Sequence, residues 1–223
     1  MPLKPVIQID SQSAVLNGSN RDKVKLSQSL SVRGCVKFEN FLSAGMLSRI
    51  GQLLSAASFY DSIHKGIARE SCMRKNALFD LFHFLLNDQI VFDFIQSLTG
   101  CKKIRCFRGR LYRLLPDARY YDSWHSDWDG KRMVGLSINL SPQVYEGGVF
   151  QIRLKGSQDL LSETANTGTG DALCFRLGKN RVHRVTSVTG QHPKVAFAGW
   201  FQNQPSFIST LQRGLKKKTG SRK

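Results

Sequence analysis

The sequence predicts a mainly β fold of the α+β class, in which an N-terminal helical part supports a β-sandwich or jelly roll. Apolar residues recur at helical spacing between residues 43 and 100. From residue 102 onward the pattern changes to short β-like runs separated by Gly, Pro, Asp and Asn. Hydrophobic residues make up 41% of the 223 residues, which is enough for one sizeable core.

The N-terminal third begins with a weak pattern and then becomes clearly helical. Residues 1–30 are polar, and we interpret them as a loose lead-in with one strand at residues 4–9. An apolar, strand-like run follows at residues 32–41, and Ser43 is typical of a helix N-cap. Four apolar residues then share one face of the predicted helix: Met46, Ile50, Leu53 and Ala57.

Two further helices are expected before the β-rich part. Residues 59–76 are irregular and charged, which indicates a loop, and the strongly apolar residues 77–86 predict a helix. Asp88 is suited to cap another helix, which Gly100 should end. The β-like runs are residues 104–115, 120–125, 133–140, 149–154, 171–177, 183–188 and 194–201.

The chain is strongly basic, with a formal net charge of +17. Residues 213–223 carry six of these positive charges and no acid, so the rest of the chain still carries +11. One interpretation is a soluble surface with a frayed basic tail. The other is an anionic partner, such as an acidic peptide or a nucleic acid.

Several classes of protein are disfavoured by composition. No run of about 18 apolar residues predicts a membrane span, and the N-terminus has no apolar stretch typical of a secretory signal. The five cysteines are odd in number and contain no CxxC pair, which argues against a disulfide framework or a zinc site. We therefore expect a cytoplasmic protein.

A histidine and an aspartate stand two positions apart at His125 and Asp127. In an extended segment such residues point to the same side, so imidazole and carboxylate can be presented together. His183 begins another strand-like run 58 positions later. Two histidines and one carboxylate can occupy one face of an octahedral metal and leave three positions open, which is typical of non-haem iron(II) oxygenases. Because an HxD motif alone is weak evidence, the surrounding sequence has to support it.

The surrounding sequence, about residues 104–201, resembles the prolyl-4-hydroxylase-like branch of the 2-oxoglutarate/Fe(II)-dependent dioxygenases. The matched pieces are His125-x-Asp127, Gly147-Gly148, Gly170-Asp171-Ala172-Leu173, His183-Arg184-Val185, Gly190, Lys194 and Trp200-Phe201. The resemblance implies a double-stranded β-helix core, which is a cupin-like jelly roll. It also implies Fe(2+) held by His125, Asp127 and His183, with 2-oxoglutarate and O2 as cosubstrates.

The resemblance further implies residues that bind 2-oxoglutarate. The family places an arginine or lysine on the last strand to hold the distal carboxylate, and Lys194 occupies that position, with His192 as the competing cation. Lys194 shares a strand face with Ala196 and Ala198, which leaves room for a slim ligand. Tyr112 and Asn139 correspond to further pocket positions, and for both an ordinary structural hydrogen bond is the alternative.

The resemblance implies hydroxylation of an unactivated C–H bond, with succinate and CO2 as coproducts. We expect a peptide or protein side chain, possibly acidic, as the substrate, and residues 58–76, 117–123 and 155–169 as loops that gate the pocket. The alternatives are a free amino acid, another small molecule or a nucleic acid. Related nucleic-acid repair enzymes carry paired arginines after the distal histidine, whereas this chain has only Lys194 at that spacing. A catalytically silent jelly-roll binding module with a basic surface is the alternative from another class.

These expectations divide the chain into three parts. Residues 1–30 form the lead-in, residues 31–208 form the dioxygenase domain, and residues 209–223 form a basic tail. Within the domain, helical support is expected over residues 43–100 and the jelly-roll core over residues 102–202. The sequence leaves the oligomeric state open.

Overall fold

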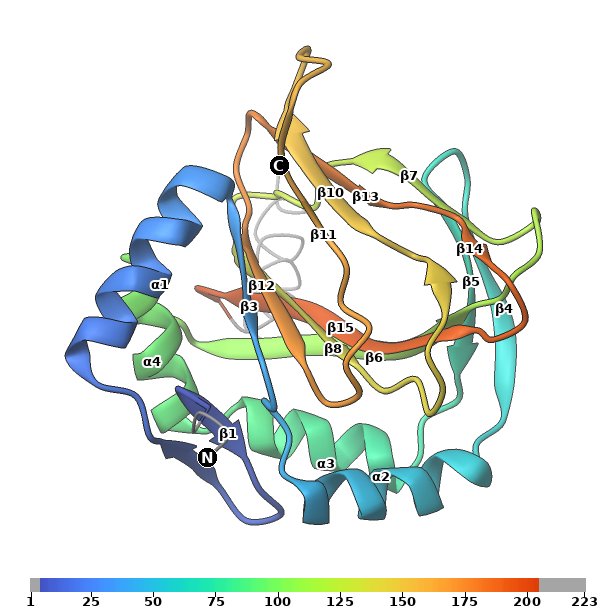
Figure 1. Cartoon of the computed structure of the whole chain (residues 1–223), viewed down its shortest axis with the longest axis horizontal. Helices are drawn as coiled ribbons and strands as arrows, with labels where there is room; N and C mark the ends of the chain where they lie inside the picture. The colour runs from blue at the N-terminus through green and yellow to red at the C-terminus, as the bar shows by residue number, and fades with distance from the viewer. Residues whose placement is uncertain (1–4, 205–223) are drawn as a thin grey trace, which may run out of the picture.

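The computed structural model describes residues 5–204, and a large antiparallel sheet dominates this part of the chain. Eleven strands form the sheet, ten of them in the order β11-β10-β13-β7-β5-β6-β15-β8-β12-β3, while β4 pairs only with β5. The sheet curls over so that β10, β13 and β7 lie above β15, β8 and β6 (Figure 1). Its two end strands meet, because Cys35 Sγ on β3 lies 3.0 Å from Ser162 Oγ on β11. The sheet is therefore nearly closed, as the predicted jelly roll requires.

The strands of the β-rich part have the following bounds: β6 (Cys106–Leu114), β7 (Tyr121–His125), β8 (Arg132–Asn139), β9 (Glu146–Gly147), β10 (Phe150–Leu154), β11 (Leu160–Thr164), β12 (Ala172–Arg176), β13 (Arg181–Val185), β14 (Val188–Thr189) and β15 (Lys194–Gln202). The prediction of short strands from residue 102 onward is confirmed. It missed β11, which lies within residues 155–169, a segment expected to be a loop. Only Leu160 and Leu161 interrupt the polar residues there, so the sequence pattern was too weak to indicate an edge strand.

The N-terminal segment is more ordered than the sequence pattern suggested. It contains β1 (Ile7–Ile9), β2 (Ala14–Leu16), the helix α1 (Asn20–Arg33) and β3 (Cys35–Phe38). The interpretation of residues 1–30 as a loose lead-in is wrong for α1, because Ser19 and Asp22 form a capping box and Gly34 ends the helix with a positive φ of 75°. Only Leu30 of this helix is buried, so hydrophobic periodicity could not reveal it.

Three helices support the sheet as predicted. They are α2 (Ala44–Ser55), α3 (Ala77–Leu86) and α4 (Gln89–Thr99). Ser43 and Asp88 cap α2 and α4, and Gly100 ends α4. In Figure 1, α2 and α3 lie beneath the layer that contains β6, β8 and β15. Phe82 of α3 stacks on Phe197 of β15 with ring centroids 4.3 Å apart, so the helices and the sheet share one core.

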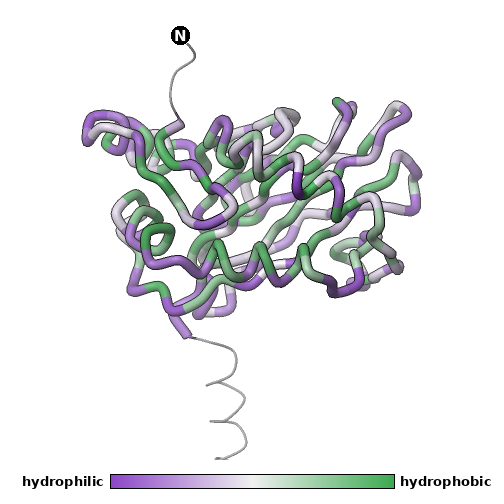
Figure 2. Tube along the Cα trace, turned by 90° about the horizontal axis from the view of Figure 1, so that it is seen from below, coloured by the Kyte–Doolittle hydropathy of each residue, from purple (hydrophilic) through white to green (hydrophobic). Residues whose placement is uncertain are grey.

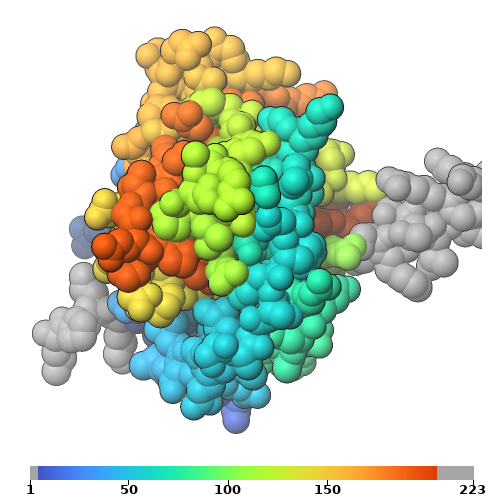
Figure 3. Space-filling model, turned by 90° about the vertical axis from the view of Figure 1, so that its right-hand side faces the viewer, coloured from blue at the N-terminus to red at the C-terminus, as the bar shows by residue number. Residues whose placement is uncertain are grey.

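Residues 59–76 are not an irregular loop, because most of them form a hairpin of β4 (Phe59–His64) and β5 (Ala68–Met73). β5 also pairs with β6 and β7, so the hairpin is part of the barrel wall. Figure 3 shows this hairpin in cyan beside the yellow-green segment around β7. The hairpin contains many charged residues, so its sequence does not show the alternation of apolar and polar residues that predicts a strand.

Hydrophobic residues line the strands and helices, and hydrophilic residues gather at the outer loops (Figure 2). No helix of residues 5–204 is long and apolar enough to cross a membrane. The predicted basic tail, residues 209–223, lies outside the described residues.

Candidate active site

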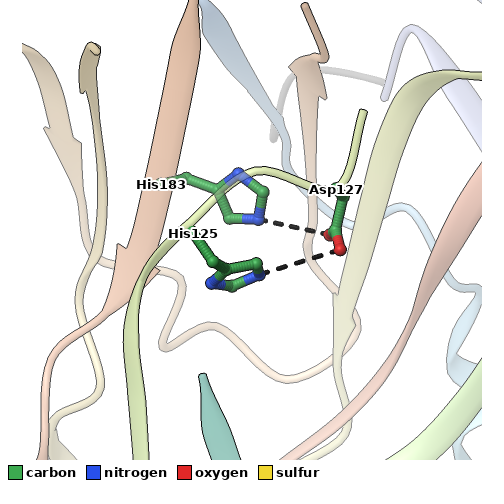
Figure 4. A group of neighbouring side chains, drawn as sticks. All are labelled: His125, Asp127 and His183. Atoms are coloured by element: carbon green, nitrogen blue, oxygen red, sulfur yellow. Dashed lines mark ion pairs between the residues drawn. The ribbon is translucent and has the colours of Figure 1, made fainter. Parts of the chain in front are cut away.

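The predicted metal ligands come together from two neighbouring strands, β7 and β13, and from the segment that follows β7. His125 is the last residue of β7, Asp127 follows two residues later, and His183 is the central residue of β13. β7 and β13 are antiparallel neighbours in which His125 and His183 stand directly opposite each other. Figure 4 shows both imidazoles directed toward the Asp127 carboxylate.

The three side chains are close enough to hold one metal ion. His183 Nε2 lies 3.3 Å from Asp127 Oδ2, and His125 Nε2 lies 3.8 Å from Asp127 Oδ1. One potential ligand atom from each residue lies within 4.8 Å of the others. Two neutral imidazoles and one carboxylate form the donor set that non-haem iron(II) prefers, and they leave other positions open. The residues therefore fit iron(II).

His125 is oriented by groups behind it. Its Nδ1 lies 2.7 Å from the Ser123 carbonyl oxygen and 3.1 Å from Asp122 Oδ1. These acceptors require a proton on Nδ1, which leaves Nε2 as the metal-binding atom. Burial alone would lower the pKa of His125, but the nearby carboxylates of Asp122 and Asp127 outweigh burial and raise it to about 10 in the metal-free protein. A bound metal would therefore displace the Nε2 proton.

Asp127 is fixed from its other side. Trp200 Nε1 donates a hydrogen bond to Asp127 Oδ2 at 2.7 Å, and Arg132 Nη1 lies 3.5 Å from Oδ1. Burial would raise the pKa of Asp127, but its contacts with His125 and His183 hold the pKa well below the usual range. The carboxylate is therefore ionised and ready to bind a cation.

A cavity of about 320 Å³ connects these ligands with Lys194 and Tyr112. Its size is at the lower end of the range for small-molecule sites. Apolar side chains such as Phe150, Leu173 and Phe175 form part of its wall. The cavity can therefore shield a small ligand from water.

Lys194 is a buried cation within this cavity. It is 3% exposed, and its Nζ donates a hydrogen bond to the Gly148 carbonyl oxygen at 2.7 Å. Burial lowers the pKa of Lys194 to about 8, although Asp122 partly offsets this effect. No carboxylate of residues 5–204 forms an ion pair with it. A buried ammonium without a counter-ion fits an anionic ligand, whereas the competing cation, His192, is exposed.

The Gly147-Gly148 pair shapes the backbone beside Lys194. Both residues have positive φ angles, 68° and 60°. A Cβ on Gly148 would lie 2.7 Å from the Tyr145 ring and 3.2 Å from the Lys194 side chain. Only glycine therefore allows the Gly148 carbonyl to approach the lysine without displacing its neighbours.

Tyr112 and Asn139 differ in their positions. Tyr112 is buried and lines the cavity, and no hydrogen bond joins its hydroxyl to another residue of the described part. Asn139 is fully buried on the inner face of β8 but does not line the cavity. Its amide donates to the Gly168 carbonyl and accepts from the Ser141 N–H, each at 3.0 Å. The structural alternative therefore accounts for Asn139 better than a contact with 2-oxoglutarate does.

Sequence reasoning missed several polar residues of the site. Asp122 stands behind His125, and Arg132 contacts Asp127. Glu70 and Arg110 form an ion pair in the cavity wall. Arg110 and Tyr112 are two residues apart on one strand and share a face, which is the only local signal that could have indicated Arg110.

Comparisons with known proteins agree with this geometry. A model of the 2OG-Fe(II) oxygenase superfamily matches residues 111–202, a segment that contains the three predicted ligands and Lys194. No curated protein sequence matches the chain.

Solved structures of three other proteins share the fold. A 2OG-Fe(II) oxygenase family oxidoreductase from Burkholderia pseudomallei is 14% identical with a TM-score of 0.61, over 88% of this chain and 96% of that one. A prolyl hydroxylase from Trichoplax adhaerens, solved with a hypoxia inducible factor peptide fragment, is 13% identical with a TM-score of 0.60, over 82% and 90%. A Pseudomonas putida prolyl-4-hydroxylase is 13% identical with a TM-score of 0.57, over 82% and 100%.

At these identities the solved structures show the fold alone, and the family model matches the segment that carries the candidate site. The family's enzymes use Fe(2+), 2-oxoglutarate and O2, and the His-Asp-His cluster fits that metal. Residues 111–202 match the 2OG-Fe(II) oxygenase superfamily, the chain has a prolyl-4-hydroxylase-like fold, and the protein is an oxygenase.

Proposed function

We propose that the protein hydroxylates an unactivated C–H bond of a peptide or protein side chain, with succinate and CO2 as coproducts. His125, Asp127 and His183 hold the iron, and Lys194 binds the distal carboxylate of 2-oxoglutarate. The observation that carries the proposal is the buried ammonium of Lys194, which lacks a counter-ion and lines the same cavity as the three ligands. When bound, iron(II) with 2-oxoglutarate and O2 supplies the oxidising power for the reaction.

The residues of the chain contribute binding, orientation and exclusion of water. Asp122 and the Ser123 carbonyl keep His125 Nε2 available to the metal. Lys194 attracts one end of the cosubstrate, which fixes the end near the ligands. The apolar wall around Phe150 and Phe175 excludes water from this region.

A peptide substrate is supported by the neighbour from Trichoplax adhaerens, whose structure contains a peptide fragment. We further propose that the catalytic domain spans residues 31–208. All five cysteines are free, which suits the reducing environment of the cytoplasm.

The test is an anaerobic titration of the purified protein with Fe(II) and 2-oxoglutarate, followed by the visible metal-to-ligand charge-transfer band. The wild type should develop the band and His125→Ala should not. Lys194→Met should need at least a tenfold higher 2-oxoglutarate concentration, because the distal carboxylate loses its cation. His192→Gln is the matched control and should behave as wild type. A folded wild-type protein without the band would contradict the proposal.

Hydroxylation itself is then tested with a peptide library under air. Mass spectrometry should find a peptide that gains one oxygen atom in parallel with succinate formation. Oxygen gain on a free amino acid but on no peptide would contradict the proposed substrate class.

A further inference from the structure

A second charged group lines the cavity and has no part in holding the metal or in the binding of 2-oxoglutarate by Lys194. Arg110 of β6 and Glu70 of β5 form an ion pair in the cavity wall. Arg110 Nε donates to Glu70 Oε2 and Nη2 donates to Oε1, both at 2.8 Å. Glu70 is 4% exposed, whereas the side chain of Arg110 is 33% exposed.

This pairing uses only one edge of the guanidinium. Arginine has five N–H donors in a rigid plane, and Glu70 occupies the edge formed by Nε and Nη2. Nη1 has no hydrogen-bond partner in the part of the chain that the structure describes. The edge formed by Nη1 and Nη2 therefore remains available, and its spacing matches the two oxygens of a second carboxylate.

Aromatic rings keep the guanidinium in place. The centroids of the Tyr112 and Trp200 rings lie 5.5 Å and 5.7 Å from its central carbon. Ala198 stands directly opposite Arg110 in the sheet and also lines the cavity, so a small side chain leaves space there. A guanidinium held by an ion pair and two rings is preorganised for binding.

Arg110 lies near Asp127, one of the predicted metal ligands. Trp200 connects the two, because its indole N–H binds Asp127 while its ring contacts Arg110. Arg132 stacks 3.9 Å from the centroid of the same ring and also lines the cavity. An anion bound by Arg110 would therefore lie near the metal ligands and near a second cation.

Burying the Arg110–Glu70 ion pair costs desolvation free energy. Replacing a buried ion pair with apolar residues of similar volume is often neutral or stabilising, so stability alone does not account for it. The net charge of the protein also favours an anionic ligand. Residues 5–204 carry 26 of the 33 basic residues and all 16 acidic ones, which gives a net charge of +10.

We propose that Arg110 binds a carboxylate of the substrate through its Nη1/Nη2 edge, so that the substrate is a carboxylic acid or a peptide with an acidic residue beside the oxidised position. This inference rests on the proposed function. Glu70 orients the guanidinium, and the small cavity restricts the bound group to a compact one.

The test uses matched acid and amide probes on the anaerobic complex with Fe(II) and saturating 2-oxoglutarate, which keeps the probes away from Lys194. The small pair is butanoate and butanamide, of which only the first carries a carboxylate. The peptide pair is acetyl-Gly-Asp-Gly-amide and acetyl-Gly-Asn-Gly-amide. Binding is measured as a change in the charge-transfer band and independently by calorimetry.

The wild type should bind at least one acid probe with a Kd at least tenfold below that of its amide. Arg110→Met alone would leave Glu70 buried without a partner and risks misfolding, so the main variant is Arg110→Met with Glu70→Leu. In this double variant the acid-to-amide ratio should fall to within twofold. Arg113→Met, on the same strand but outside the cavity lining, is the matched control and should keep the wild-type ratio.

The outcomes separate this inference from the proposed function. A wild-type protein that forms no charge-transfer band overturns both. A band with equal binding of acids and amides, or with no acid-specific binding up to tens of millimolar, overturns the carboxylate site alone. A preference that persists in the double variant also overturns it, as does tighter binding of inorganic phosphate than of either acid. Acid preference in the peptide pair assigns the carboxylate to a peptide, and preference in the small pair alone assigns it to a free acid.

Discussion

Trp200 donates its indole N–H to Asp127 Oδ2 at 2.7 Å, across 73 positions of sequence. Trp200 lies on β15, and Asp127 lies in the loop after β7. Asp127 Oδ1 lies near His125 and Arg132 instead, so the indole fixes the orientation of the carboxylate. Outer partners of this kind typically influence metal affinity by 10- to 100-fold.

Trp200→Phe should therefore weaken iron(II) binding about tenfold while the protein stays folded. Phenylalanine retains the apolar ring but lacks the donor, so Asp127 loses its orientation. Anaerobic metal titration with a competing chelator measures the change. Trp124→Phe, on the outer side of β7, is the control. Unchanged metal affinity in Trp200→Phe would mean that Arg132 alone positions the carboxylate.

The affinity for 2-oxoglutarate should depend on pH through Lys194. The pKa of this lysine is about 8 before the cosubstrate binds, and only the protonated form attracts the distal carboxylate. The Kd should be constant below pH 8 and should rise by up to tenfold per pH unit above it. Lys194→Arg should remove the dependence, because arginine remains protonated. The same pH dependence in Lys194→Arg would assign the titration to another group.

Lys194 should also reduce the stability of the protein without its cosubstrate. Burial lowers the pKa of this lysine in the folded state from 10.5 to about 8, so the unfolded state binds more protons between these values and stability rises with pH across that window. Below pH 8 the buried charge costs about 3 kcal/mol. Lys194→Met should therefore be more stable at pH 7 by about 1–3 kcal/mol, allowing for the lost hydrogen bond to Gly148. Urea unfolding measures this difference, and a less stable variant would contradict it.

Asn139→Ala should lower stability without changing cosubstrate affinity. Removing the amide leaves the Gly168 carbonyl and the Ser141 N–H without their partner in a buried region, at a cost of about 2–3 kcal/mol. The Kd for 2-oxoglutarate should stay within twofold of the wild-type value. A large rise in Kd with normal stability would instead support the pocket role that the family resemblance implies.

Local sequence was sufficient wherever neighbouring residues define the structure. Ser43, Asp88 and Gly100 predicted helix ends because caps are made within one turn. His125 and Asp127 share a side because their spacing fits an extended chain. The family motifs then related His183 and Lys194 to them, and the structure brings all four to one cavity.

Local sequence failed where burial or pairing is decided by distant residues. The helix α1 buries only Leu30, so its hydrophobic pattern was weak although its capping box was present. The charged hairpin β4–β5 is held by pairing with β6 and β7, which its own sequence does not specify.

By itself, the sequence predicted the fold class, the cofactors and the resemblance to the oxygenase family. Only the tertiary structure decided that Trp200 orients Asp127, that Asn139 supports the backbone, and that Glu70 leaves one edge of Arg110 available. The physical reason is that hydrogen bonds and ion pairs depend on distances of about 3 Å between atoms. Antiparallel pairing sets these distances between residues that are tens of positions apart, and no local pattern records which residues the closed sheet brings face to face.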